Sequence, residues 1–150
     1  MRLAIDLAVE NVRSGRGGPF GAVVVKDGQV IGRGVNSVTA TTDPTAHAEV
    51  MAIREACRAV GGFQLEGCVL YSSCEPCPMC LGAIYWARPA TFYFAATRED
   101  AALAGFDDDL IYRQLQLRPE ERLIPGYRLS ADTGEDPFVA WAQSPQRIAY

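Results

Sequence analysis

Two short motifs in this chain carry residues that could do chemistry together. Thr-Ala-His-Ala-Glu places His47 two residues before Glu49, and Glu-Pro-Cys-Pro-Met-Cys places Cys77 three residues before Cys80. One imidazole nitrogen and two thiolates suit Zn²⁺, and three protein ligands leave the fourth tetrahedral position to water. His47, Cys77 and Cys80 therefore predict a zinc site of the open, catalytic type, with one ion per subunit.

Glu49 supplies the proton-transfer group that such a site needs. Zinc lowers the pKa of a bound water to about 7, and a neighbouring carboxylate can take up the water's proton and deliver it to a leaving amine. We expect Glu49 to be this proton shuttle. The pattern H-x-E followed by P-C-x-x-C is the signature of zinc-dependent hydrolytic deaminases.

Other metal sites could use some of the same residues. Cys74, Cys77 and Cys80 are evenly spaced, so together with His47 they could form a closed, structural zinc site. A module of that kind would act through protein contacts and would have no use for a proton shuttle. An iron–sulfur site fits less well, because Ile84 stands where a fourth cysteine would be needed. We expect the open site.

The composition favours a small globular enzyme. The 150 residues, 49% hydrophobic and 21% charged, suit one domain over residues 1–150. The net charge of −4 counts against a nucleic-acid partner, which usually requires a basic face. No segment has the pattern of a signal peptide or a membrane span, so we expect a cytoplasmic protein with no membrane partner. In that reducing compartment, five cysteines indicate metal binding rather than disulfides.

The elements that must position these residues follow from periodicity and turn signals. The sequence predicts helices over 3–14, 109–117 and 137–143, and strands over 22–25, 29–35, 69–72 and 91–95. Asp27-Gly28 predicts a hairpin turn. A helix should start at Asp43-Pro44 and stop at Gly61-Gly62, and another should open near Cys77-Pro78 and end before Pro89. This order predicts a mixed α/β sheet layered with helices.

His47 and Glu49 can converge on one metal only at a helix end. Two residues correspond to roughly 200° of rotation, so on the flank of a helix the two side chains would point apart. Side chains of a first turn fan around the helix axis instead. Cys77 and Cys80 would share one face of another first turn, where the helix dipole favours thiolates. The site should therefore lie beyond the ends of two helices.

Longer stretches, PTAHAEVMAIREAC, SCEPCPMCLGAIYWARP and AGFDDDLIY, extend these motifs, and a glycine-rich loop, GGPFGAVVVKDG, precedes them. Together they resemble bacterial guanine deaminases of the cytidine-deaminase-like superfamily, over nearly the whole chain. The resemblance implies a three-layer α/β/α sandwich with a mixed five-stranded central sheet. It implies hydrolysis of guanine to xanthine and ammonia, with His47, Cys77 and Cys80 as zinc ligands and Glu49 as shuttle. Cys74 is not a ligand in this pattern.

The same resemblance implies substrate contacts from Asn36 and from Asp107 or Asp108, and we also expect Ala48 at the substrate site. The Asn36 amide can donate and accept hydrogen bonds, whereas a carboxylate at 108 can only accept them from ring N–H or amino groups. These enzymes are similar in being homodimers that exchange C-terminal segments. In this chain the exchanged segment would be about 130–150, which would bring Tyr150 into the partner's site.

Aromatic side chains at three positions could stack on a flat purine: Phe20, Trp86 and Tyr150. Core packing is the alternative for each of them. The expected partner is thus a small nucleobase. A tRNA adenosine deaminase would use the same metal motif, but the acidic charge and the absence of a Lys-rich tail count against it. Other amino-heterocycles, such as cytosine or a triazine, remain alternative substrates.

Overall fold

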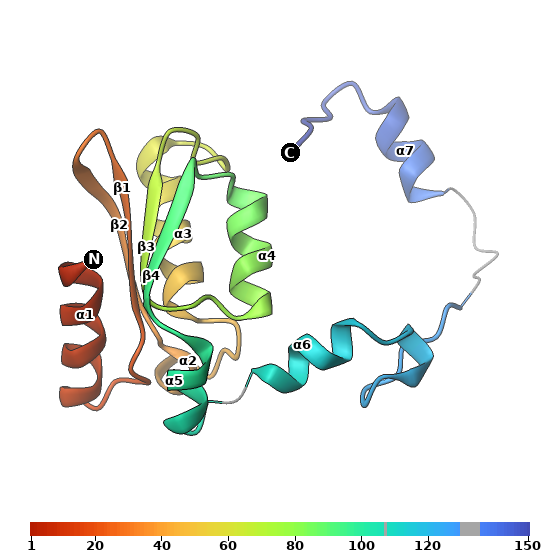
Figure 1. The fold of residues 1–150 in the computed structure, drawn as a ribbon. Coiled ribbons are helices and arrows are strands. Elements are labelled where there is room, and N and C mark those ends of the chain that lie inside the picture. The colour runs from red at the N-terminus through yellow and green to blue at the C-terminus, as the bar shows by residue number, and fades with distance from the viewer. Residues whose placement is uncertain (107, 130–135) are drawn as a thin grey trace. The chain divides into compact units, whose positions relative to one another are not determined.

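The computed structural model describes residues 1–106, 108–129 and 136–150, which form two compact units, Met1–Tyr112 and Arg113–Tyr150 (Figure 1). None of the helices in these described ranges is long and apolar enough to span a membrane. The elements of the first unit are α1 (Arg2–Arg13), β1 (Gly21–Lys26), β2 (Gln29–Val35), α2 (Val38–Thr41), α3 (Ala48–Val60), β3 (Val69–Cys74), α4 (Pro78–Ala87), β4 (Thr91–Ala96), α5 (Arg98–Leu103) and the first half of α6 (Asp109–Leu115). The second unit holds the end of α6, the 3-10 helix η1 (Pro119–Glu121) and α7 (Pro137–Gln143).

The first unit is a sheet between two layers of helices. The strand order is β2-β1-β3-β4, with β1 antiparallel to β2 and β3, and β4 parallel to β3. Helix α1 covers one face, and α3 and α4 cover the other (Figure 1). The predicted three-layer α/β/α architecture and the mixed sheet are confirmed.

The sheet has four strands in the described part of the chain, whereas the resemblance implied five. After β4 the chain turns into helix α5 because Thr97 caps it. The Thr97 hydroxyl accepts a hydrogen bond from the Asp100 backbone N–H, and the Asp100 carboxylate accepts one from the Thr97 backbone N–H. This reciprocal capping box stabilises a helix start rather than a further strand.

One predicted helix boundary is wrong, and the error matters for the site. Helix α3 begins at Ala48, with His47 as its N-cap, instead of at Asp43-Pro44. The Asp43 carboxylate accepts hydrogen bonds from the Thr45 backbone N–H and hydroxyl, so this segment forms a turn. The stop at Gly61 is confirmed. The short helices α2 and α5 were not predicted from the sequence, although Thr97 and Asp100 have the spacing of a capping box.

Close packing between β2 and α3 fixes where α3 starts. A Cβ atom at Gly34 would lie 2.0 Å from the backbone oxygen of Ala48, so only glycine lets the strand approach the helix this closely. Ala48 and Ala52 are fully buried on the α3 face that meets β1 and β2. Small residues on both surfaces therefore hold the first turn of α3 against the end of β2.

Candidate active site

The N-termini of α3 and α4 supply the metal-capable side chains. His47 is the N-cap of α3 and Cys77 is the N-cap of α4, and both have extended backbone conformations. Cys80 follows in the first turn of α4 and is fully buried. Because an N-cap residue lies outside the helical spiral, its side chain can point beyond the helix end. The prediction that the site lies off the ends of two helices agrees with these positions.

The three side chains fit a tetrahedral zinc ion. The His47 Nδ1 atom lies 3.5 Å from the Cys77 sulfur and 3.5 Å from the Cys80 sulfur. These three atoms all lie within 4.8 Å of one another. Zinc bonds of about 2.0–2.1 Å to nitrogen and 2.3 Å to sulfur, at the tetrahedral angle, place the two atoms about 3.5 Å apart. The donor types and their separations therefore suit zinc.

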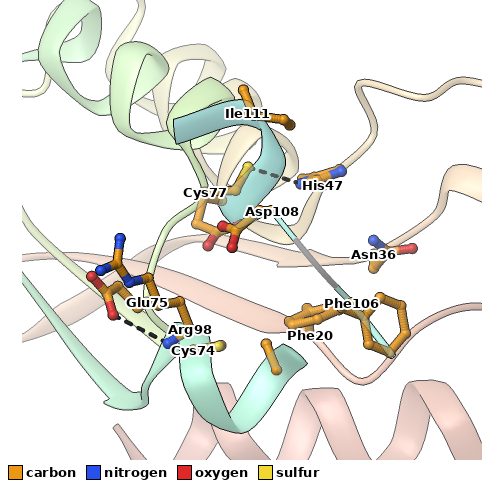
Figure 2. A pocket seen from close by; sticks show the side chains of 12 residues that line it. Phe20, Asn36, His47, Cys74, Glu75, Cys77, Arg98, Phe106, Asp108 and Ile111 are labelled. Carbon is orange, nitrogen blue, oxygen red and sulfur yellow. Dashed lines mark hydrogen bonds between the residues drawn. The ribbon is translucent and has the colours of Figure 1, made fainter. Parts of the chain in front are cut away.

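Cys74 stands apart from this group although it is only three residues before Cys77. Its thiol donates a hydrogen bond to the Thr97 backbone oxygen at 3.4 Å, and burial raises its pKa to about 11. Figure 2 shows Cys74 on the side of the cavity away from the Cys77–His47 pair. A closed site with three cysteines would need Cys74 to leave this bond and turn toward the other sulfurs.

Hydrogen bonds within the metal-capable group shift the pKa values of its three side chains. A hydrogen bond from Cys80, together with one from His47, lowers the pKa of Cys77 to about 4. The same bond raises the pKa of Cys80, and the contact with Cys77 raises the pKa of His47. Zinc binds cysteine as thiolate, so a metal ion held here would displace any proton that the two sulfurs retain.

Glu49 lies beside this group in the first turn of α3. Its side chain is buried, with 5% of its surface exposed, and its Oε1 accepts a hydrogen bond from the Ser72 hydroxyl at 2.9 Å. Burial raises the pKa of the Glu49 carboxyl, partly countered by hydrogen bonds to the charged form. A carboxyl with a raised pKa holds a proton more readily than an exposed one, which suits a group that must accept a proton and return it. Ser72, on β3, was not among the predicted site residues.

A cavity of about 280 Å³ opens onto these groups within the first unit. Its size, near the lower end for ligand pockets, suits a small molecule. Its apolar walls are Phe20, Ala101, Phe106 and Ile111. Figure 2 shows Phe20 and Phe106 together on one side, with Asn36 beside them and Cys77, His47 and Asp108 further along. The cavity therefore offers apolar, partly aromatic walls next to hydrogen-bonding groups.

The structure brings several of the predicted substrate residues into this cavity. Phe20, Asn36 and Asp108 all line it. Burial, followed by the negative charge on Cys77, raises the pKa of Asp108. Asp107 lies outside the described residues. These side chains come from segments before β1, after β2 and before α6, so the fold collects them from distant parts of the sequence.

Two of the predicted substrate residues do not line the cavity. Ala48 is fully buried in the core, packed close to β2, so its side chain does not reach the cavity. Trp86 is 63% exposed on α4 and lies neither in the core nor in the cavity. It follows Cys80 by six residues, about 9 Å along the helix and about 240° around it, which turns it away from the site. Tyr150 belongs to the second unit.

Other residues at the cavity were not predicted from the sequence. The Phe106 ring meets Phe20 edge to face, with ring centres 4.9 Å apart. The Arg98 backbone N–H donates a hydrogen bond to Glu75 (Figure 2), and its guanidinium lies 5.0 Å from the Tyr112 ring centre. Phe106 lies within the GFDDD stretch, so an aromatic residue next to an acidic run was the available signal. Glu75 and Arg98 had no sequence signal that would have placed them at the cavity.

The fold and the metal-capable group define the class of protein. Residues 1–96 match the family described as the cytidine and deoxycytidylate deaminase zinc-binding region. The chain belongs to this family of zinc-dependent deaminases.

Particular relatives are more informative than the family alone. A guanine deaminase from Bacillus subtilis is 54% identical over 150 residues, which is 100% of this chain and 96% of the relative. The crystal structure of a guanine deaminase from that species superimposes with a TM-score of 0.96 over 99% of this chain and 95% of the other. A guanine deaminase structure from Nitrosomonas europaea gives 0.67 at 33% identity, over 71% of this chain and 62% of the other. A tRNA-specific adenosine deaminase from Aquifex aeolicus is 49% identical over 52% of each chain.

Proposed function

We propose that this protein hydrolyses guanine to xanthine and ammonia with zinc as its cofactor. The observation that carries the proposal is the full-length similarity to a guanine deaminase, which includes the C-terminal residues after the family's zinc-binding region. The similarity to tRNA adenosine deaminases covers only 52% to 72% of this chain. The acidic net charge also suits a small base better than a nucleic acid.

His47, Cys77 and Cys80 would hold the zinc ion, since their donor atoms match its preferred geometry. When bound, zinc supplies a Lewis acid that makes water a competent nucleophile near neutral pH. The Cys77 position at the start of α4 adds the positive end of the helix dipole to the stabilisation of its thiolate.

Glu49 would manage the protons of the reaction. It would accept a proton from the attacking water as the C–O bond forms at carbon 2 of guanine and the C2=N3 π electrons move onto N3. It would then return that proton to the amino nitrogen as the C–N bond breaks and the C2=N3 bond re-forms, so ammonia leaves and the 2-hydroxy product tautomerises to xanthine. The Ser72 hydroxyl orients one carboxylate oxygen and leaves the other for this transfer. Because Glu49 is buried, bulk water cannot compete for the proton.

The remaining cavity residues would bind the purine ring. Phe20 and Phe106 present an aromatic surface on which a flat base can stack. Asn36 can donate a hydrogen bond to the guanine carbonyl or accept one from a ring N–H, and Asp108 can accept from N–H groups. Together they would hold the amino-bearing carbon near Glu49.

The deciding experiment is a screen of the zinc-loaded protein for ammonia release. Guanine, adenine, cytosine, their nucleosides, a triazine and a tRNA with adenosine in the anticodon are the test compounds. We expect turnover of guanine, with xanthine identified by its ultraviolet spectrum. Turnover of another compound without guanine turnover would contradict the substrate assignment. Steep salt sensitivity of tRNA deamination would favour the editing enzyme instead.

We also propose a homodimer in which the C-terminal segment of one chain, about 130–150, closes the partner's cavity and places Tyr150 there. Tyr85, Trp86 and Tyr93 support an interface, because α4 and β4 expose these large apolar side chains. Mixing a Glu49→Gln chain with a chain truncated before residue 130 provides the test. If tails act between chains, the mixture regains activity that neither variant has alone; no recovery would show that each tail serves its own cavity. A cytoplasmic location stays a prediction.

A further inference from the structure

Asn11 is a buried residue that does not line the cavity, but its side-chain amide is hydrogen-bonded to backbone that carries two cavity residues. It lies on the α1 face that packs on the sheet and is fully buried. Its Nδ2 donates to the Gly18 backbone oxygen at 2.9 Å and to the Asn36 backbone oxygen at 2.8 Å. One side chain thus ties α1 to the glycine-rich loop and to the residue that follows β2.

Both acceptors belong to backbone that carries cavity side chains. Gly18 stands two residues before Phe20, and the Asn36 backbone N–H donates to the Phe20 backbone oxygen at 3.1 Å. Both backbone polar groups of Asn36 are therefore hydrogen-bonded. Its N–H pairs with Phe20, and its carbonyl oxygen pairs with Asn11. Since both neighbours of the Asn11 amide are carbonyl oxygens, only its NH₂ group can face them.

Gly17 makes this arrangement sterically possible. A Cβ atom at this position would lie 2.1 Å from the Asn36 backbone oxygen and 3.0 Å from Asn11 Nδ2. The glycine-rich loop therefore packs directly against the Asn36 carbonyl group, which also accepts the hydrogen bond from Asn11. Asn36 therefore has little freedom to move toward the loop or away from α1.

The Asn11 Oδ1 atom is buried and has no hydrogen-bond partner among the described residues. The hydrogen bonds that this side chain makes to the described residues are therefore the two that its NH₂ group donates, to the Gly18 and Asn36 backbone oxygens. Their direct consequence is a fixed backbone position at Asn36 and two residues before Phe20.

We propose that Asn11 is a positioning residue for base recognition, which acts by fixing the backbone of Asn36 and Phe20. This inference rests on the proposed guanine deaminase activity. It predicts that loss of the Asn11 donors weakens base binding while the proton chemistry at Glu49 continues. Most of the effect should depend on the Asn36 side chain, because Asn11 binds the Asn36 backbone directly and reaches Phe20 only through Gly18.

The test is a double-mutant cycle of Asn11→Leu and Asn36→Ala, with KM and kcat for guanine as readouts. Leucine has the same number and branching of side-chain heavy atoms as asparagine, and it removes both donated bonds. We expect Asn11→Leu to raise KM about tenfold with kcat within about threefold. In the Asn36→Ala background the same change should alter KM less than about twofold, because coupled residues are not additive. Ala8→Gly on the same helix is the control for destabilised α1, and it should lower Tm and leave KM unchanged.

Several outcomes would overturn the inference while guanine turnover by the wild type stands. One is a lowered Tm with unchanged KM in Asn11→Leu. Another is the full rise in KM persisting without the Asn36 side chain. Asn11→Ser, which admits water, is the second variant if the leucine form does not fold, and failure of both to fold would show a purely structural role. Absence of guanine turnover in the wild type would instead contradict the proposed function, and the cycle would then use the base that is turned over.

Discussion

Two parts of the cavity are built in different ways. The floor, His47, Glu49, Cys77 and Cys80, comes from two helix N-termini in one layer, and its members are two and three residues apart within each motif. The rim comes from three loops that are 16 to 86 residues apart in the sequence, and its residues are Phe20, Asn36, Phe106 and Asp108. The floor is set by local geometry, whereas the rim is set by tertiary contacts.

Because of this difference, the floor would set the chemistry of the site and the rim would set its specificity for one base. The floor residues provide a metal-capable group and a buried carboxylate that would suit deamination of many amino-heterocycles. The rim residues provide the aromatic pair and the hydrogen-bonding groups that would select one base. Changes in the floor should therefore abolish turnover, and changes in the rim should alter affinity.

The largest expected effect is loss of the metal from the floor. Cys77→Ser should lose zinc and all measurable turnover, because the loss of a ligand costs more than the roughly 10–100-fold in affinity lost when an outer partner is removed. Cys74→Ser is the matched control, and it should keep one zinc per chain by metal analysis. Zinc loss in Cys74→Ser as large as in Cys77→Ser would show that the floor includes Cys74.

The next effect separates the metal from the proton shuttle within the floor. Glu49→Gln should retain zinc and reduce kcat by about 10²–10⁴, the usual contribution of a positioned acid–base group. Glu55→Gln, on the exposed side of the same helix, is the control and should change kcat less than about twofold. Near-normal kcat in zinc-loaded Glu49→Gln would rule out the shuttle role.

The floor could be predicted from the sequence far better than the rim. The spacing of His47, Glu49, Cys77 and Cys80 within two motifs was enough to place them at helix ends, although the start of α3 was put four residues too early. The turn made by Asp43 and Thr45 competes with a helix start, and sequence signals for the two are nearly the same.

The rim depended on contacts that spacing does not encode. Phe106 meets Phe20 across 86 positions of sequence, and no periodicity links them. Trp86 carried the right chemistry for stacking, but its angle around α4 directs it away. The resemblance implied a fifth strand, but in the described residues the Thr97–Asp100 capping box starts a helix after β4. Long-range packing decides the first of these features, whereas helix geometry and a local cap decide the other two.

A smaller effect is expected from the rim. Phe106→Ala removes the edge-to-face contact with Phe20, and such ring pairs contribute about 0.5–1.5 kcal/mol. KM for guanine should rise about threefold to tenfold, with kcat little changed, in steady-state assays. Leu103→Ala, on the same stretch but 90% exposed, should leave both constants unchanged. A fall in kcat without a change in KM would place Phe106 with the floor instead.

The smallest effect concerns Cys74, and it tests whether this residue belongs to the floor as a metal ligand. Burial raises the pKa of Cys74 to about 11, so its thiol is protonated at neutral pH and only the rare thiolate reacts with iodoacetamide. Alkylation of Cys74 in the zinc-loaded protein, followed by mass spectrometry, should therefore speed up about tenfold per pH unit between pH 8 and 10. A metal-bound thiolate would show no such rise, because zinc keeps its ligands deprotonated. A rate independent of pH would therefore identify Cys74 as a fourth ligand, which would close the site to water. The predicted rise would instead leave the fourth coordination position open for the catalytic water.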